Sequence, residues 1–234
     1  MKRRAMLGDN KFDYIQDGLV LWFDGVWNNG IGKHNDNATV WKDLSGNNAD
    51  AILGGALPAG AWTEDSFNFE LTNSYFTVPQ NKIPSSYPYG ANDYTIEYCW
   101  KSMPYDMSIF ESGVMKRLNA LACVNLYSNG SFMYRNYWYD SDFDFNQPYE
   151  SKKQYYGVSF NGQIQTGYID AEVKATYSHT GKNTSQNNIY IGGGPEHPQW
   201  PMRTNLYSLR VYNRCLSANE IQQNYLIDKK RFNL

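Results

Sequence analysis

Turn-forming residues recur along this chain about every ten residues, and that spacing strongly limits the folds that it can adopt. Glycine, asparagine and serine separate short apolar segments that are rich in aromatic side chains, with 20 Tyr and 7 Trp among 234 residues. Short aromatic segments between closely spaced turns are typical of β-strands, and many such strands indicate a sandwich or a barrel. We therefore expect an all-β chain that folds as an antiparallel β-sandwich.

Two segments illustrate how the strands are expected to lie. Residues 18–24, GLVLWFD, form an uninterrupted apolar run, which predicts a strand that is covered on both faces. Residues 94–101, YTIEYCWK, instead place Tyr, Ile, Tyr and Trp at alternate positions, with Thr, Glu, Cys and Lys between them. Because successive side chains of a strand point to opposite faces, one face of this strand is predicted to lie in the core.

Local turn chemistry predicts where strands pair as hairpins. Asn129-Gly130 and Asn161-Gly162 tolerate the positive φ angles that tight hairpin turns require. Residues 67–79, FNFELTNSYFTVP, alternate around a Thr-Asn-Ser turn and predict a further hairpin. About a dozen strands result, which is enough for two packed sheets.

The segment RVYNRCLSANEIQQNY, residues 210–225, predicts a strand that leads directly into a helix. Ser217 is a good N-cap, and Glu220 stands where a carboxylate completes a capping box. Ile221 and Tyr225 then share one helical face. Since a short isolated helix is marginal in water, we expect a short C-terminal helix that docks on the sandwich.

The chain is expected to form one domain. Residues 14–234 contain no linker or internal repeat, whereas residues 1–13 are polar, basic and without periodicity, which indicates a basic N-terminal tail or docking peptide. The net charge of −2, with no basic run beyond the start, argues against nucleic-acid binding and against an anionic membrane surface. No apolar window approaches the ~18 residues of a membrane span, and the start lacks the apolar stretch of an export signal.

Cysteine usage indicates a reduced protein. Cys99, Cys123 and Cys215 lie far apart, show no Cys-x-x-Cys spacing and are odd in number. We expect them to be buried packing residues rather than members of a disulfide framework.

Two motifs carry a resemblance to a known family. The turn W-x-D-L-S-G-N begins at Trp41, and R-V-Y-N-R-x-L-S-x-x-E-I begins at Arg210. With the strand patterns, they make about residues 17–232 similar to laminin-G-like, concanavalin A-like jelly-roll modules, of the kind found in bacteriophage virion proteins and bacterial surface proteins. The resemblance implies a single jelly-roll domain over residues 14–234. It also implies, in most members, non-catalytic binding to glycans or to other proteins.

The resemblance also raises the question of a structural calcium ion. Members of the family often carry an acid just before the R-V-Y-N-R strand, where this chain has Tyr207 and Ser208. Asp43, Asn47 and Asn48 offer oxygen ligands of the kind that calcium takes. The alternative is that these side chains bond to the local backbone and shape the turn. The expected function requires no cofactor under either interpretation.

Aromatic residues in loops are the candidates for binding a glycan. Neutral sugars stack their apolar faces on aromatic rings and add a few polar contacts. The rings that qualify are Trp27, Tyr137, Trp138, Tyr139 and Trp200. The alternative for each ring is that it covers an end of the sandwich core. The remaining tryptophans lie in strand patterns and are expected in the core: Trp22, Trp41, Trp62 and Trp100.

An enzymatic interpretation depends on one acidic triplet. A retaining glycosidase needs two carboxyl groups ~5–5.5 Å apart, which alternate positions of a strand supply. Asp140, Asp142 and Asp144 alternate in this way. The alternative is an edge strand whose acids are solvated and discourage pairing with other chains, while Phe143 and Phe145 turn inward. We favour the edge strand and expect a protein that is not an enzyme.

Three functions remain open at this stage. The first is a non-catalytic virion surface protein, a head or tail decoration or fibre module, with possible glycan binding for host or mucus attachment. Its partners would be other virion proteins, bound through residues 1–13, cell-surface glycans and further copies of the chain. This function fits the missing export signal, because phage proteins leave the cell by lysis. The second is a secreted or cell-surface bacterial carbohydrate-binding module, and the third is a glycoside hydrolase.

Overall fold

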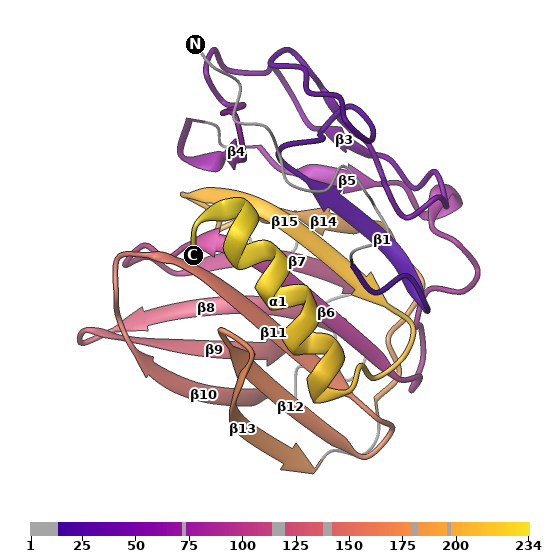
Figure 1. The fold of residues 1–234 in the computed structure, drawn as a ribbon, viewed down its shortest axis with the longest axis vertical. Helices are drawn as coiled ribbons and strands as arrows, with labels where there is room; N and C mark the ends of the chain where they lie inside the picture. The colour runs from indigo at the N-terminus through magenta and orange to yellow at the C-terminus, as the bar shows by residue number, and fades with distance from the viewer. Residues whose placement is uncertain (1–13, 72–73, 114–119, 138–141, 179–181, 196–197) are drawn as a thin grey trace.

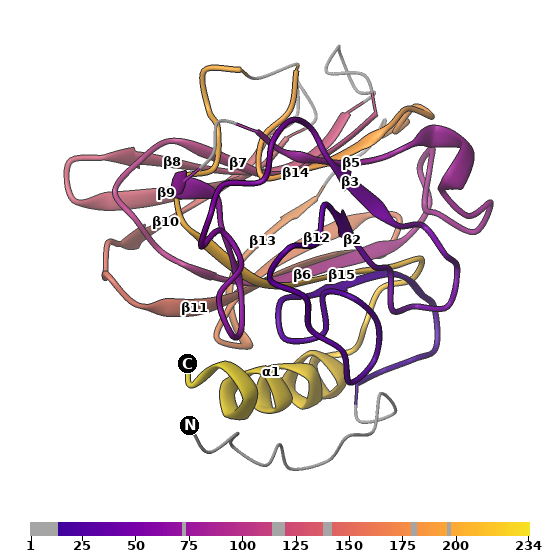
Figure 2. The same ribbon diagram turned by 90° about the horizontal axis from the view of Figure 1, so that it is seen from above.

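The structure is a computed structural model. It describes residues 14–71, 74–113, 120–137, 142–178, 182–195 and 198–234. Two antiparallel sheets pack face to face, and helix α1 (Ala218–Phe232) lies against the outer face of one of them (Figures 1 and 2). The expected all-β sandwich with a C-terminal helix is confirmed. The predicted tail, residues 1–13, lies outside the described residues.

The first sheet has seven strands, and the first and last strands of the chain are neighbours in it. In spatial order it contains β1 (Leu19–Asp24), β15 (Asn205–Tyr212), β6 (Tyr94–Lys101), β11 (Lys153–Phe160), β12 (Ile164–Ile169) and β13 (Glu172–Ser178), with β4 (Phe67–Asn68) paired to β15. The first strand therefore pairs with the last, with Leu21 opposite Val211.

The second sheet has eight strands, and all of its pairings are antiparallel. In spatial order it contains β10 (Phe143–Pro148), β9 (Ser131–Tyr137), β8 (Ala120–Ser128), β7 (Met107–Gly113), β14 (Ile189–Ile191), β5 (Phe76–Val78), β3 (Ala51–Leu53) and β2 (Val40–Trp41). Two short 3-10 helices, η1 (Phe69–Leu71) and η2 (Gln80–Lys82), connect strands.

Aromatic rings fill the space between the sheets. Trp62 meets Trp41 and Phe67 edge to face, with centroid distances of 5.0 and 4.8 Å. Such pairs add about 0.5–1.5 kcal/mol each beyond the area that they bury. The four tryptophans predicted for the interior are confirmed as buried: Trp22, Trp41, Trp62 and Trp100.

The hairpin predicted over residues 67–79 is wrong. β4 pairs with β15 in the seven-stranded sheet, whereas β5 pairs with β3 and β14 in the eight-stranded sheet. The chain crosses from one sheet to the other here because Phe67, Phe69 and Phe76 all lie in the core between the sheets. Turn chemistry indicates that the chain reverses, but it does not say which partner each arm finds.

The other two predicted turns are confirmed. Asn129 and Gly130 both have positive φ, 49° and 79°, and join β8 to β9. Gly162, with φ of 83°, lies in the turn that joins β11 to β12. The Asn161 carboxamide oxygen accepts hydrogen bonds from the N–H groups of Gln163 and Ile164, which stabilises this second turn.

Helix α1 begins as the sequence predicts. The Ser217 hydroxyl accepts a hydrogen bond from the N–H of Glu220, whose carboxylate accepts one from the N–H of Ser217. Ile221 and Tyr225 are buried against the seven-stranded sheet. The helix therefore covers the second face of β6, and both faces of that strand are buried rather than one.

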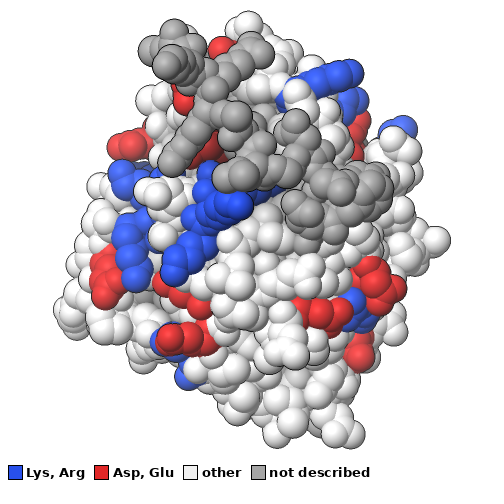
Figure 3. Space-filling view, viewed as in Figure 1, with Lys and Arg blue, Asp and Glu red and all other residues white. Residues whose placement is uncertain are grey.

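The charges of α1 follow its dipole. The first turn carries Glu220 and the last turn carries Lys229, Lys230 and Arg231, which stabilises the helix at both ends. Figure 3 shows positively charged side chains gathered around the C-terminal half of the helix. Arg231 turns back toward the sheet, where its guanidinium lies 2.8 Å from the buried Asp24 carboxylate.

A buried ionic network lies between α1 and the sheet. The Arg210 guanidinium donates hydrogen bonds to Glu97, at 3.0 Å, and to Asp228 of α1, and all three side chains are fully buried. Burial raises the pKa of the Glu97 carboxyl, against the opposing effects of Arg210 and Tyr155. The sequence did not predict this network, because the positions between the apolar residues of β6 resemble a solvated face.

The same network holds the start of the described chain. The Tyr14 hydroxyl donates a hydrogen bond to Asp228 at 2.6 Å, and the N–H of Ile15 donates one to the Asn224 carboxamide at 3.0 Å. Tyr14 is itself 3% exposed. The segment that leads into β1 is thus fastened to α1, more than two hundred positions later in the sequence.

The three cysteines are free thiols, as expected. Cys99 and Cys123 are buried, whereas Cys215 is half-buried. Burial raises the pKa of both buried thiols well above the ordinary value. Among the described residues, no helix has the length and apolar character needed to cross a membrane.

Candidate functional site

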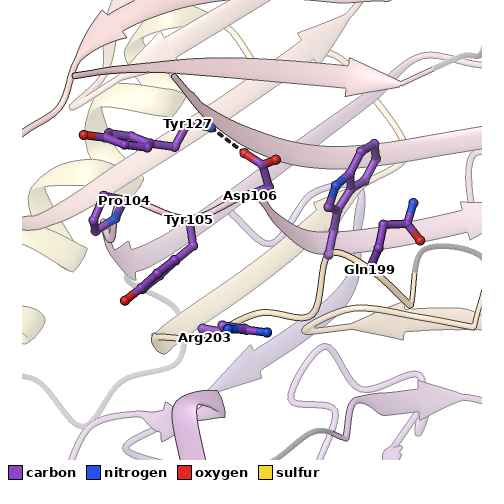
Figure 4. A pocket seen from close by; sticks show the side chains of 7 residues that line it. Pro104, Tyr105, Asp106, Tyr127, Gln199 and Arg203 are labelled. Atoms are coloured by element: carbon purple, nitrogen blue, oxygen red, sulfur yellow. Dashed lines mark hydrogen bonds between the residues drawn. The ribbon is translucent and has the colours of Figure 1, made fainter. Parts of the chain in front are cut away.

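A pocket of about 320 Å³ opens at one end of the eight-stranded sheet, where β7 begins and β8 ends (Figure 4). Three separate segments form it: the turn between β6 and β7, the end of β8, and the loop that precedes β15. The residues that line it are Pro104, Tyr105, Asp106, Tyr127, Gln199, Trp200 and Arg203.

Two of these residues hold each other in place. One carboxylate oxygen of Asp106 accepts a hydrogen bond from the backbone N–H of Tyr127 at 2.7 Å, shown as the dashed line in Figure 4. The Tyr127 ring packs edge to face against Phe132 and Tyr149, with centroid distances of 5.7 and 5.6 Å. The turn before β7 is therefore tied to β8, and the positions of both side chains are set without a ligand.

Trp200 packs against the eight-stranded sheet. Its half-buried ring packs on the outer face of β8, against Ala122, Val124 and Leu126. Its carbonyl oxygen accepts a hydrogen bond from the N–H of Ser108 at 2.8 Å, which anchors the loop to β7. One part of the Trp200 ring thus packs on the sheet, and another part lines the pocket.

The opposite side of the pocket is more exposed. Tyr105 is 45% exposed, and the guanidinium carbon of Arg203 lies 6.0 Å from the centroid of its ring. This distance is at the outer limit of a cation–π contact. In the view of Figure 4, Tyr105 lies between Asp106 and Arg203, and Gln199 lies across the pocket from Pro104.

These groups together suit a small polar ligand with apolar faces. Aromatic rings offer surfaces for stacking, the Asp106 carboxylate accepts hydrogen bonds, and Arg203 and Gln199 donate them. Aromatic side chains with a few converging polar groups are typical of ligand sites, and the volume lies at the small end of their ~300–1,000 Å³ range.

The structure brings one of the predicted aromatic residues into this site, namely Trp200. Trp27 is only 4% exposed and belongs to the apolar cluster beneath α1, which is the alternative of a ring that covers the core. Tyr137 ends β9, where its backbone pairs with Ala122. Trp138 and Tyr139 lie outside the described residues.

Sequence reasoning missed most of the residues around Trp200. Tyr105 and Asp106 follow a proline between two strands, and that turn alone was a usable signal for an exposed ring beside an acid. Tyr127 resembles a core residue, because the aromatic residues of β8 and β9 alternate in the same way. No local pattern links Arg203 to either of them.

The turn at Asp43 is explained by hydrogen bonds within the protein. Its carboxylate accepts from three backbone N–H groups and from the Ser45 hydroxyl, at distances between 2.8 and 3.1 Å. The Asn47 amide donates to the carbonyl of Val20, and Asn48 adopts a positive φ of 57°. The part of the chain that the structure describes contains no group of three or more His, Cys, Asp and Glu side chains placed to hold a metal.

The two described acids of the triplet, Asp142 and Asp144, lie at a sheet edge, as predicted. β10 is the outermost strand of the eight-stranded sheet, and Phe143 and Phe145 are buried at 2% and 6% exposure. Arg135 of β9 binds both described acids, with nitrogen-to-oxygen distances of 3.2 Å to Asp142 and 2.7 Å to Asp144. Asp140 lies outside the described residues.

The buried network beneath α1 contains ionisable groups with shifted pKa values, namely Glu97 and Arg210. Clusters of this kind often mark active sites. Here Glu97, Arg210 and Asp228 have no exposed surface, and their charges are directed at one another. The cluster therefore stabilises the contact between helix and sheet and is not open to a ligand.

Comparison with known proteins shows the fold and nothing finer. No family model and no curated protein matches the chain. Among solved structures, a botulinum neurotoxin serotype D binding domain matches with a TM-score of 0.65 and 15% identity, over 91% of this chain and 51% of that one. Trypanosoma rangeli sialidase in complex with sialic acid matches with a TM-score of 0.62 and 17% identity, over 92% of this chain and 33% of that one.

The chain thus spans about half the length of the neurotoxin domain and a third of the sialidase. Both matches cover nearly all of this chain at identities too low to carry a shared activity. We conclude that residues of this sequence form a β-sandwich of the same kind as the sandwiches within those larger proteins.

Proposed function

We propose that this chain is a non-catalytic, lectin-like binding module on the surface of a virion, where it decorates the head or tail or forms part of a fibre. It binds a glycan of the host cell or of mucus in the pocket around Trp200. The observation that carries the binding function is this pocket, in which aromatic rings and converging polar groups are held by the sheet.

The similar structures support binding as the role of the sandwich. One of them is named as a binding domain, and another is a complex with sialic acid. The resemblance to laminin-G-like, concanavalin A-like modules supports the virion assignment and the absence of catalysis. In this proposal residues 1–13 bind other virion proteins, which leaves the pocket free for the glycan.

The arrangement of the acids favours binding over hydrolysis. Asp142 and Asp144 both form ion pairs with Arg135, whereas a retaining glycosidase needs one carboxylate as nucleophile and another as acid. Replacing both with Asn is expected to leave glycan binding unchanged. We expect no sugar release from either the wild-type protein or this variant. Release of sugar by the wild-type protein, lost in the double variant, would establish the glycosidase instead.

The binding function is tested on a broad glycan array with purified full-length protein. We expect retention of a defined set of glycans, loss of that signal in Trp200→Ala, and an unchanged signal in Tyr177→Ala. Tyr177 is the control because it is an aromatic side chain, 45% exposed, that lies on β13 of the other sheet. A blank array for the wild-type protein would overturn the glycan-binding function.

The same array tests the metal. The Asp43 carboxylate is already engaged by four donors, so we expect binding to be equal with calcium and with a chelator. Loss of binding on chelation would restore a calcium ion to the proposal.

The virion assignment needs a separate test. Changing Lys2, Arg3 and Arg4 to Ser in the full-length chain is expected to abolish co-purification with virus particles while glycan binding persists. If the protein is never found with particles but is found on or outside bacterial cells, it is a secreted or surface carbohydrate-binding module.

A further inference from the structure

The charges in the pocket restrict its ligand. Asp106 and Arg203 contribute one negative and one positive charge, which sum to zero. An acidic sugar would be attracted by Arg203 but repelled by the Asp106 carboxylate. A sugar with a free amine would be attracted by Asp106 but repelled by Arg203. A neutral ligand that both donates and accepts hydrogen bonds satisfies both side chains.

The pocket combines apolar surface with its polar groups. Three aromatic side chains line it, from three separate segments: Tyr105, Tyr127 and Trp200. Pro104 extends the apolar wall beside Tyr105. A pyranose ring presents one apolar face and stacks on one aromatic ring, which leaves apolar surface of the neighbouring side chains beside it. An apolar substituent on the sugar would occupy that surface.

An acetamido group combines the required features. It has an N–H donor, a carbonyl acceptor and a methyl group on one planar unit, and it carries no charge. We propose that the pocket selects sugars with an acetamido group, a proposal that rests on the glycan-binding function above. The amide N–H donates to the Asp106 carboxylate, the amide carbonyl accepts from Arg203, and the methyl group packs on an aromatic ring.

The geometry of the pocket suits this role. Asp106 is oriented by its hydrogen bond from the Tyr127 N–H, which occupies one carboxylate oxygen and leaves further lone pairs to accept from a ligand. A volume of about 320 Å³ holds one or two sugar rings rather than a long chain. Discrimination therefore depends on the substituents of one or two rings.

The test compares two matched probes by calorimetric titration. One is the β-1,4-linked trimer of N-acetylglucosamine and the other is the β-1,4-linked trimer of glucose, which differ at the acetamido position. We expect the acetylated trimer to bind at least about tenfold more tightly, the effect of one charge-assisted hydrogen bond and a buried methyl group.

Two variants locate the preference in the pocket. Arg203→Met retains the length of the side chain but removes its donors, and we expect the preference to fall to about threefold or less, with binding of the glucose trimer unchanged. Arg214→Met removes a guanidinium beside α1 and serves as the control, with the preference intact. An unchanged preference in Arg203→Met would overturn the assignment of that residue.

The outcomes separate this inference from the proposed function. Equal binding of both trimers, tighter binding of the glucose trimer, or array binding confined to sugars without an acetamido group would overturn the acetamido preference and leave glycan binding standing. A protein that binds no glycan on the array would overturn both.

Discussion

The two outer faces of this sandwich are covered in different ways. On the seven-stranded sheet, α1 seals the face over a fully buried ionic network that joins Glu97, Arg210 and Asp228. On the eight-stranded sheet, a loop covers β8 with the half-buried ring of Trp200 and leaves a pocket beside it. The first face uses charge to hold secondary structure together, and the second leaves polar groups accessible. The difference indicates which face can change without loss of the fold.

The largest expected effect comes from breaking the network beneath the helix. Arg210→Met leaves Glu97 and Asp228 buried without their cation, and we expect the free energy of unfolding to fall by about 3–5 kcal/mol. Arg214→Met removes a partly exposed ion pair with Glu220 and should cost about 0–1 kcal/mol. Chemical denaturation of both variants measures the contrast, and equal losses would show that burial does not set the strength of these pairs.

A pair of tryptophans sharpens the comparison between the faces. Trp22 is fully buried beneath α1, so Trp22→Ala should lower the free energy of unfolding by about 3–5 kcal/mol. Trp200→Ala removes a half-buried ring and should cost about 1 kcal/mol, and we expect it to abolish the proposed glycan binding. If Trp200→Ala unfolds the protein, the second face is structural as well.

Lys182 is a buried ionisable residue in a different environment. Lys182 is 5% exposed, and its ammonium lies 3.2 and 3.9 Å from the ring centroids of Phe160 and Tyr94. Burial lowers its pKa to about 5, against the opposing effect of Asp93. Because the folded state holds this amine neutral, stability is full above the ordinary lysine pKa and is lost as the pH falls toward 5.

We therefore expect Lys182→Met to raise the free energy of unfolding at pH 7 and to flatten its dependence on pH between 9 and 6. Denaturation at several pH values measures both changes, with Lys174→Met on the exposed strand β13 as the control. A variant that is less stable at pH 7 would show that the cation contributes to folding, as Arg210 does.

The smallest effect concerns the start of α1. Ser217→Ala removes the hydroxyl of the capping box and should lower the free energy of unfolding by about 1 kcal/mol. The exposed Asn219, in the same turn, is the control, and Asn219→Ala should have almost no effect. A large loss in Ser217→Ala would indicate that the cap, rather than the ionic network, holds the helix in place.

The strands and the helix start were predictable because their signals are local. Alternation in β10 identified the inward rings of Phe143 and Phe145, and the spacing of Ser217 and Glu220 identified the helix cap. The crossing between β4 and β5 was not predictable, because a turn motif does not specify the sheet that each arm joins.

The pocket could be predicted only in part for a similar reason. Trp200 stood out as an aromatic residue in a loop, but its neighbours come from two other segments that meet only in three dimensions. The buried face of β6 was missed because Glu97 suits solvent as well as it suits a buried arginine. Local patterns assign side chains to faces, whereas tertiary contacts determine what covers each face.

The attachment of Tyr14 and Ile15 to α1 has a mechanical consequence. Both residues form hydrogen bonds with the helix, to Asp228 and Asn224. The start of the described chain is therefore attached directly to its last helix. Tension applied between the N-terminal segment and α1 would first break these two hydrogen bonds and only afterwards separate β1 from β15. The pocket lies on the other sheet, outside that path. Force on the N-terminal segment would therefore reach α1 and β1 before it reached the strands that carry the pocket.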